Sequence, residues 1–287
     1  MQERRPTKFL VISDIHYGID YKSRNDSEDK HVMGGWGRTV MPTIVTHSRN
    51  FDAVLDIGDS HTAYDWIFEK GQMHRWVWEL ENFRVQMGLH KYFNVFGNHC
   101  GKISDRIGYP FRPGSDDFCS QYVDLPEFRI VLSNAGTRQM SSVGRFIPTE
   151  HFRWLEDVIG NSPKPVIFVQ HVPPDEFDNG DELYEFLSGL EMVALAIHGH
   201  RHDPTKMEVQ HGIPVLHMQA LLKEGHAGIP DINIAEITAT DEEIQILARG
   251  LNADCGTDKL FRIDRRDLNL TGAAPAPCCP HSEPSTP

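Results

Sequence analysis

Five short apolar runs, each followed directly by polar residues, constrain the fold of this chain more than any other feature. The runs are residues 9–13, 53–57, 92–96, 166–170 and 193–197. They are nearly continuous in apolar character and rich in β-branched residues, which is typical of strands buried on both faces. The sequence therefore predicts five core strands.

Patterns typical of helices lie between several of these runs. Apolar residues recur mostly three, four or seven positions apart over residues 65–83, and residues 149–159 form a second helical pattern. For the second helix we expect Thr149 as the N-cap and an end at residues 160–163. Strands that alternate with helices predict an α/β fold built in layers. Three further strands, near residues 232–237, 244–248 and 260–263, are expected to complete the second sheet.

A polar cluster follows each of the five predicted core strands. The clusters are Asp14-Ile15-His16, Gly58-Asp59, Gly97-Asn98-His99, His171, and His198-Gly199-His200-Arg201-His202. In open α/β sheets, ligands bind beyond the carboxyl ends of the strands. We therefore expect these clusters to meet at one edge of the fold.

The spacing within the clusters suits a shared cavity. Residues two apart, such as Asp14 and His16, would face the same way in an extended backbone, and the same holds for His200 and His202. A glycine precedes several of the polar residues, and we expect it to let the backbone turn sharply there. These glycines are Gly58, Gly97 and Gly199.

The side chains in the clusters offer oxygen and nitrogen donors but no thiolate. Such a set suits Mn, Fe, Zn, Ni or Co better than Ca, and it argues against a cysteine-rich structural zinc site. The residues alone thus predict a transition-metal site.

The ordered pattern Asp-x-His, Gly-Asp, Gly-Asn-His, His, Gly-His-x-His resembles that of the calcineurin-like metallophosphoesterases, over about residues 8–240. The resemblance implies a binuclear metal hydrolase of phosphoric esters with a four-layer α/β/β/α sandwich. It implies two divalent or mixed-valence metal ions, with Mn or an Fe/Zn pair favoured. By motif, one metal would be held by Asp14, His16 and His202 and the other by Asn98, His171 and His200, with Asp59 bridging them and His99 as the catalytic histidine outside the ligand set.

The implied chemistry is physically reasonable. Two metals roughly 3.5–4 Å apart can share a hydroxide and stabilise both the attacking and the leaving oxygen of a displacement. The carboxylate of Asp59 would fix their separation. A proton or hydrogen bond from His99 to the leaving oxygen would contribute about 10²–10⁴-fold in rate.

One position departs from the family pattern. Cys100 stands where an acid usually follows Gly-Asn-His, so His99 lacks one source of stabilisation for its charged form. Either another acid replaces it in space, or His99 acts as a hydrogen-bond donor. Cys100 itself is interpreted as a packed thiol beside the site, with a thiolate ligand or nucleophile as the alternative. His61 and His226 are candidates for contact with the metal ligands or the substrate, against ordinary packing or surface roles.

Specificity is expected to reside in three loops, residues 17–38, 100–117 and 219–230. Tyr17 and Trp36 in the first loop have two open interpretations: they stack on a nucleobase, or they pack the loop.

The net charge and the motifs narrow the range of substrate classes. With 28 Lys and Arg against 41 Asp and Glu, the formal net charge is −13, and no basic face for long DNA or RNA is visible. The Gly-Asp-x-x-Asp-Arg-Gly motif of Ser/Thr protein phosphatases is absent. We expect a small phosphorylated substrate such as a nucleotide. The compact form resembles small-molecule phosphodiesterases of the cyclic-nucleotide or nucleotide-diphosphate type. The alternatives are a phosphomonoesterase, a nuclease, or a non-catalytic metal-binding or partner-binding scaffold.

Length and composition predict the organisation. The chain has 287 residues and 39% hydrophobic content, which suits one catalytic domain over residues 8–271. Residues 1–7 would be an N-terminal extension, and the Pro/Ala/Ser-rich residues 272–287 are expected to be disordered. Five cysteines without Cys-x-x-Cys suggest reduced thiols, and no signal peptide or membrane span is visible. A cytoplasmic protein without membrane association is expected, with its oligomeric state open.

Overall fold

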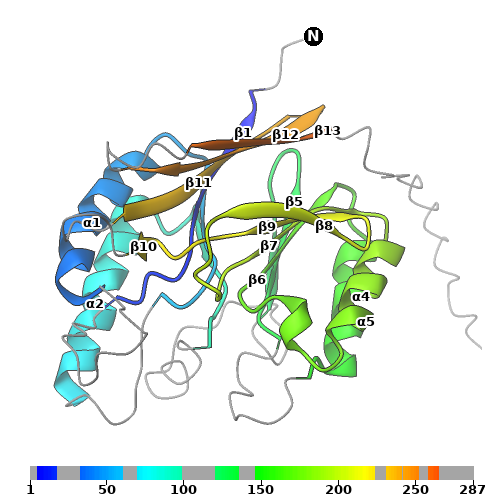
Figure 1. The fold of residues 1–287 in the computed structure, drawn as a ribbon, viewed down its shortest axis with the longest axis horizontal. Coiled ribbons are helices and arrows are strands. Elements are labelled where there is room, and N and C mark those ends of the chain that lie inside the picture. Colours follow the sequence, from blue (N-terminus) through cyan, green and yellow to red (C-terminus); the bar gives the residue numbers. More distant parts are fainter. Residues whose placement is uncertain are drawn as a thin grey trace, which may run out of the picture.

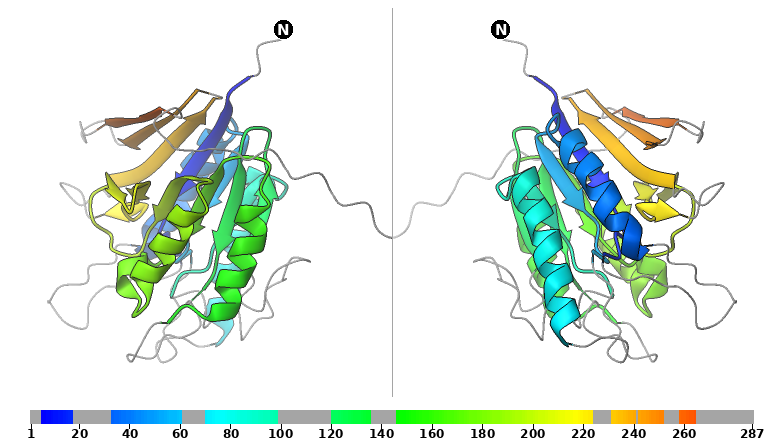
Figure 2. Two further views of the ribbon diagram at one scale, coloured as in Figure 1. Left: turned by 90° about the vertical axis from the view of Figure 1, so that its right-hand side faces the viewer. Right: turned by 90° about the vertical axis from the view of Figure 1, so that its left-hand side faces the viewer.

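The computed structural model describes residues 5–17, 33–60, 70–98, 120–135, 146–223, 231–240, 242–251 and 258–264. Two β-sheets lie face to face, with one pair of helices outside each of them (Figures 1 and 2). The predicted four-layer α/β/β/α sandwich is confirmed. Among the described helices, none is both long and apolar enough to cross a membrane.

The first sheet has seven strands in the order β13-β12-β11-β1-β2-β3, with β10 paired to β11. Strands β1, β2 and β3 are parallel, whereas β11 runs antiparallel to β1. The bounds are Thr7–Ile12 for β1, Ala53–Asp56 for β2, Tyr92–Asn94 for β3, Leu222–Lys223 for β10, Asp231–Ala239 for β11, Glu243–Gly250 for β12 and Lys259–Asp264 for β13.

The second sheet has six strands in the order β4-β5-β6-β7-β9-β8. Strands β5, β6, β7 and β9 are parallel, and the two edge strands are antiparallel to their neighbours. The bounds are Gln121–Asp124 for β4, Arg129–Ser133 for β5, Val166–Gln170 for β6, Val193–His198 for β7, Lys206–Gln210 for β8 and Ile213–His217 for β9.

The helices form the two outer layers. Figure 1 shows α1 and α2 beside the first sheet and α4 and α5 beside the second. Their bounds are Met33–Ser48 for α1, Lys70–Met87 for α2, Thr149–Gly160 for α4 and Gly180–Gly189 for α5, and a 3₁₀ turn, η1, spans Pro174–Glu176.

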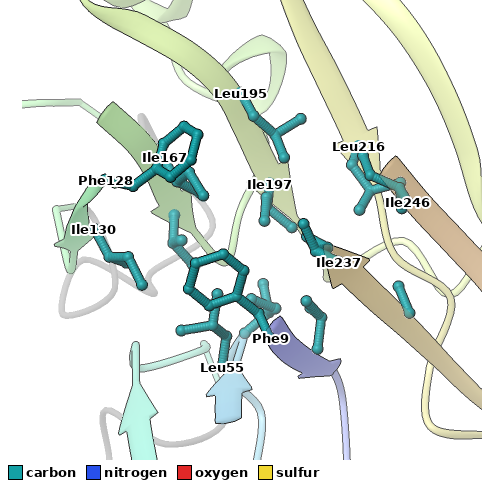
Figure 3. Packing of buried hydrophobic residues seen from close by; sticks show 14 of the residues in the cluster. Phe9, Leu55, Phe128, Ile130, Ile167, Leu195, Ile197, Leu216, Ile237 and Ile246 are labelled. Carbon is teal, nitrogen blue, oxygen red and sulfur yellow. The ribbon is translucent and has the colours of Figure 1, made fainter. Parts of the chain in front are cut away.

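Alternation along β1 shows why the core strands are apolar on both faces. Phe9 and Val11 belong to the cluster between the two sheets (Figure 3), whereas Leu10 and Ile12 belong to the cluster that includes residues of α1 and α2. All four side chains are fully buried. The five predicted strands are confirmed, with ends that differ by no more than two residues.

The structure corrects four details of the prediction. The last three strands form as expected, but they extend the first sheet instead of the second, because β11 pairs with β1. Pro148 occupies the cap position of α4, without a side-chain cap bond, so Thr149 begins the helix. Helix α1 begins at Met33, inside the loop predicted for residues 17–38. Glycines 34, 35 and 37 are poor helix formers, and tertiary packing of α1 overrides that preference. The helix predicted over residues 65–83 continues to Met87 as α2.

Candidate metal centre

The polar clusters lie where parallel strands end, and backbone hydrogen bonds join the loops that carry them. After β1 and β2, the amide of Asp14 donates to the carbonyl of Gly58 over 2.9 Å, and the amide of His16 donates to the carbonyl of Asp59 over 2.8 Å. After β6 and β7, the amide of Gly199 donates to the carbonyl of His171 over 3.0 Å. These backbone hydrogen bonds therefore hold the loops together without any side-chain contact.

The backbone at the clusters is left-handed and not extended as the sequence analysis assumed. Of the seven described non-glycine residues with positive φ, five are predicted ligands: Asp14, His16, Asp59, His200 and His202, with φ between 47° and 73°. Such conformations are uncommon outside glycine and concentrate at functional sites. The pairs two residues apart therefore converge because both members turn out of the strand direction.

Two glycines are required by close approach more than by a turn. A Cβ atom on Gly97 would lie 2.0 Å from Oδ1 of Asp59, and one on Gly199 would lie 2.2 Å from Oγ of Ser13 and 2.7 Å from Oδ2 of Asp14. Gly58, with φ of +104°, fits the predicted turn. The glycines thus let neighbouring loops touch the ligand side chains.

The first cluster joins the ends of β1 and β7. Nε2 of His202 lies 3.1 Å from Oδ1 of Asp14 and 3.1 Å from Nε2 of His16. Oδ2 of Asp14 accepts hydrogen bonds from Oγ of Ser13 at 2.5 Å and from the amide of His200 at 3.0 Å. These bonds leave Oδ1 facing the two imidazoles.

The second cluster joins the ends of β2, β3, β6 and β7. Nε2 of His171 lies 3.1 Å from Oδ2 of Asp59 and 3.2 Å from Oδ1 of Asn98. Nδ1 of His200 lies 2.8 Å from the same oxygen of Asn98. The clusters adjoin, because Nε2 of His171 is also 3.8 Å from Oδ1 of Asp14.

The orientation of His171 is set by its backbone partner. Its Nδ1–H donates to the carbonyl of Ile57 over 2.8 Å, which leaves Nε2 facing Asp59 and Asn98. A hydrogen bond of this kind fixes the tautomer of a metal-binding histidine. Sequence analysis could not find this contact, because a main-chain carbonyl has no sequence signal.

A second orienting contact involves Glu176, which sequence analysis missed. Oε2 of Glu176 lies 3.1 Å from Nε2 of His200, so Nδ1 of His200 faces Asn98. Glu176 is held in turn by Nε of Arg201 at 3.2 Å, and Nη2 of Arg201 donates to Asp175 at 2.5 Å. The sequence does show two acids shortly after His171 and an arginine beside His200. From one sequence, however, these residues cannot be distinguished from ordinary surface charges.

Charge is concentrated at the clusters. Burial alone would raise the pKa of Asp14, but the neighbouring His171 and His202 outweigh it and hold that pKa far below its ordinary value. Burial alone would lower the pKa of His171, yet the carboxylates of Asp59 and Asp14 raise it to about 9. The two carboxylates therefore draw positive charge to this point, whether a proton or a metal ion supplies it.

The donor set fits metal ions. Ligands bonded to one transition metal at roughly 2.1 Å lie roughly 3 Å apart, and the donor atoms here are separated by 2.8–3.8 Å. Within each of the two groups Asp14, His16, His202 and Asp59, His171, His200, the donor atoms lie within 4.8 Å of one another. Because carboxylate and amide oxygens and imidazole nitrogens converge here, a shared cation would stabilise them.

The clusters open to solvent on one side. The side chains of Asp14, Asp59, His16 and His171 are at most 2% exposed, whereas His200 and His202 are 17% and 29% exposed. Among these described side chains, solvent therefore reaches the clusters at His200 and His202.

Several predicted positions are not placed at the clusters. His99, Cys100, His61 and His226 lie outside the described residues. Tyr17 is buried, donates to Glu79 over 3.0 Å and contacts Phe83, which favours packing over base stacking.

Comparison with known proteins assigns the chain to a family. Residues 7–204, more than half of the chain, match the family model of the calcineurin-like phosphoesterases. The chain belongs to the calcineurin-like phosphoesterase family. As a calcineurin-like phosphoesterase, the protein is a metal-dependent hydrolase of phosphoric esters. The family implies a centre of two divalent metal ions, for which the two clusters offer candidate ligands.

One solved structure shares this fold. A dimetal phosphatase from Danio rerio superposes on this calcineurin-like phosphoesterase with a TM-score of 0.65 and 14% identity, covering 91% of this chain and 99% of that one. A predicted phosphoesterase from Streptococcus pneumoniae gives 0.44 and 16%, covering 91% and 99%, and Vps29 from Entamoeba histolytica gives 0.41 and 14%, covering 90% and 99%. No curated protein matches the sequence.

Proposed function

We propose that this protein is a small-molecule phosphodiesterase that hydrolyses phosphodiester or diphosphate bonds at a binuclear metal centre. The observation that carries the proposal is the convergence of all seven predicted donors into two adjoining clusters. These donors are Asp14, His16, Asp59, Asn98, His171, His200 and His202. Cyclic nucleotides and nucleotide diphosphates are the substrate classes we favour.

Each donor has a distinct task in this proposal. Asp14 would hold one metal together with His16 and His202, and its low pKa keeps it anionic. Asp59 contacts His171 through its carboxylate and His16 through its backbone carbonyl, which suits a residue between the two ions. When bound, the ions would supply Lewis acidity and neutralise phosphoryl charge. The oxygen and nitrogen donors suit Mn, Fe, Zn, Ni or Co, and of these we favour manganese or an iron/zinc pair by resemblance to the family.

Of the two favoured substrate classes, the charge around the clusters supports the cyclic phosphodiester. A phosphodiester carries one negative charge near neutral pH, whereas a monoester carries up to about two. Among the described residues that flank the ligands, Arg201 is already paired with Asp175 and Glu176. Its guanidinium is therefore poorly placed to balance the second charge of a monoester.

His99 is proposed as the residue that meets the leaving oxygen. It directly follows Asn98, a donor of the second cluster. Its imidazole would donate a proton or a hydrogen bond to the departing oxygen.

The test is hydrolysis of bis-p-nitrophenyl phosphate against p-nitrophenyl phosphate. Metal-stripped protein would be re-supplied separately with Mn²⁺, Fe²⁺, Zn²⁺, Ni²⁺ or Mg²⁺. We expect metal-dependent turnover with preference for the diester, and loss of that turnover in Asp59→Asn. A panel of cyclic nucleotides and nucleotide diphosphates would then define the substrate.

Each other outcome points to a different function. Preference for p-nitrophenyl phosphate would replace the proposal with a phosphomonoesterase. Cleavage of single- or double-stranded DNA would indicate a nuclease. No turnover with any metal would favour a non-catalytic scaffold.

A further inference from the structure

A buried acid that the proposed function does not use lies three residues before Asp59. Asp56 is the last residue of β2 and is fully buried. Its Oδ1 accepts a hydrogen bond from the amide of Gly58 at 3.1 Å. Its Oδ2 accepts from three side chains: Oγ of Ser60 at 2.5 Å, the hydroxyl of Tyr92 at 2.6 Å and Nη2 of Arg84 at 3.3 Å.

The charge of this acid is compensated inside the protein. The Arg84 side chain is only 4% exposed, lies over the Tyr92 ring at 5.1 Å and also donates to Glu81. A buried carboxylate without such partners would be very unfavourable. The group is therefore an organised network that joins β2, β3 and α2 at the base of the site.

Two of the hydrogen bonds to Asp56 come from the residues that flank Asp59 in the sequence. Gly58 and Ser60 are the residues on either side of Asp59, and Asp56 binds both. Asp59 has φ of +47°, a conformation that persists only when its surroundings hold it. From the β1 side, the amides of His16 and Tyr17 donate to the carbonyls of Asp59 and Ser60 over 2.8 and 2.9 Å. The backbone of Asp59 is thus held from two directions.

We propose that Asp56 is a positioning residue that sets the Asp59 carboxylate between the two metal clusters. Arg84 and Tyr92 orient Asp56 and thereby connect α2 and β3 to the centre. This inference rests on the proposed function, because it assigns Asp59 to both metals. Asp56 itself touches neither metal nor substrate.

The test uses the electron paramagnetic resonance of Mn²⁺ added to metal-stripped full-length protein. Two manganese ions that share a bridging ligand give a spin-coupled spectrum, whereas separate ions give single-ion signals. In Asp56→Asn, an NH2 group replaces one acceptor oxygen, so it opposes either the amide of Gly58 or the donors on the other side of the carboxylate. We expect the coupled signal to disappear and the affinity for the second Mn²⁺ to weaken by about 10–100-fold.

Control variants separate positioning from general destabilisation. Leu155→Ala removes a buried side chain from α4, far along the sequence from the network, and should lower stability but keep the coupled spectrum. Tyr92→Phe removes one donor and leaves the bonds to Gly58 and Ser60, so its effect should be smaller than that of Asp56→Asn.

The outcomes are distinguishable. If the wild-type protein shows no coupled pair, the proposed function fails, and this inference with it. If the wild type shows the pair and Asp56→Asn keeps it with unchanged affinity, only the positioning role is overturned. Should Asp56→Asn not fold, Ser60→Ala decides: weaker second-metal binding supports the role, and unchanged binding contradicts it.

Discussion

The Nε2 atoms of His16 and His202 lie 3.1 Å apart, although 186 positions separate the two residues in the chain. His16 follows β1 of the first sheet, and His202 follows β7 of the second. Their proximity therefore depends on the packing of one sheet on the other. A metal bound by both residues would fasten the two sheets together at this edge.

Metal binding should stabilise the fold for that reason. A ligand that binds only the folded protein adds about 2.7 kcal/mol at a concentration of 100 times its Kd. We expect Mn²⁺ to raise the Tm of metal-stripped protein and excess chelator to lower it again, as measured by differential scanning calorimetry. Asp14→Asn should lose most of this shift. An equal shift in wild type and variant would place the stabilising ion elsewhere.

Gly199→Ala should disrupt the first cluster. The added Cβ would lie 2.2 Å from Oγ of Ser13 and 2.7 Å from Oδ2 of Asp14, so Asp14 must move. We expect at least one metal equivalent to be lost in elemental analysis. Gly189→Ala is the matched control, because nothing lies within 4 Å of its added Cβ. Equal metal content in both variants would mean that the loop adapts.

Glu176→Ala should weaken metal binding without removing a ligand. The variant loses the acceptor 3.1 Å from Nε2 of His200, so the imidazole is free to rotate or change tautomer. Loss of such an orienting partner typically costs about 10–100-fold in metal affinity. Competition with a fluorescent chelator measures this directly. Glu185→Ala, an exposed change on α5, should bind metal like wild type, and a Glu176 variant that does the same would refute the orienting role.

Stability should fall at alkaline pH. Burial raises the pKa of Tyr92, and the Asp56 carboxylate raises it further, so the folded protein keeps a proton that an unfolded tyrosine loses above about pH 10. Since the folded state then binds more protons, the free energy of unfolding decreases as pH rises, by up to about 1.4 kcal/mol per pH unit for one group.

Urea unfolding between pH 8 and 11 measures this dependence. Tyr92→Phe should be less stable at neutral pH, because it loses a hydrogen bond to Asp56, and should show a shallower alkaline decline. If the free energy of unfolding fell equally steeply with pH in wild type and variant, Tyr92 would be excluded as a source of the alkaline destabilisation.

The sequence predicted which polar residues come together better than it predicted their surroundings. Donor residues at strand ends follow a pattern of types and order, so Asp14 and His202 could be proposed together without coordinates. The left-handed backbone at these residues could not be predicted, because aspartate and histidine do not indicate positive φ as strongly as glycine does. Metal binding by these residues remains a prediction.

Asp56 did carry a signal that the sequence analysis did not use. It is a charged residue inside a run predicted to be buried on both faces, and such a residue requires partners. The identity of these partners depends on the packing of α2 and β3, which sequence periodicity does not give. The same limit explains the last three strands. Their apolar pattern was correct, but the pairing of β11 with β1, which places all three in the first sheet, was not predicted.

The proposed two-metal phosphodiesterase activity is tested by titrating metal-stripped protein with Mn²⁺ during hydrolysis of bis-p-nitrophenyl phosphate. We expect activity to rise with bound metal, to reach its plateau at two ions per chain, and to exceed activity on p-nitrophenyl phosphate. Turnover that survives in metal-stripped protein under excess chelator, or no turnover with two ions bound, would contradict it.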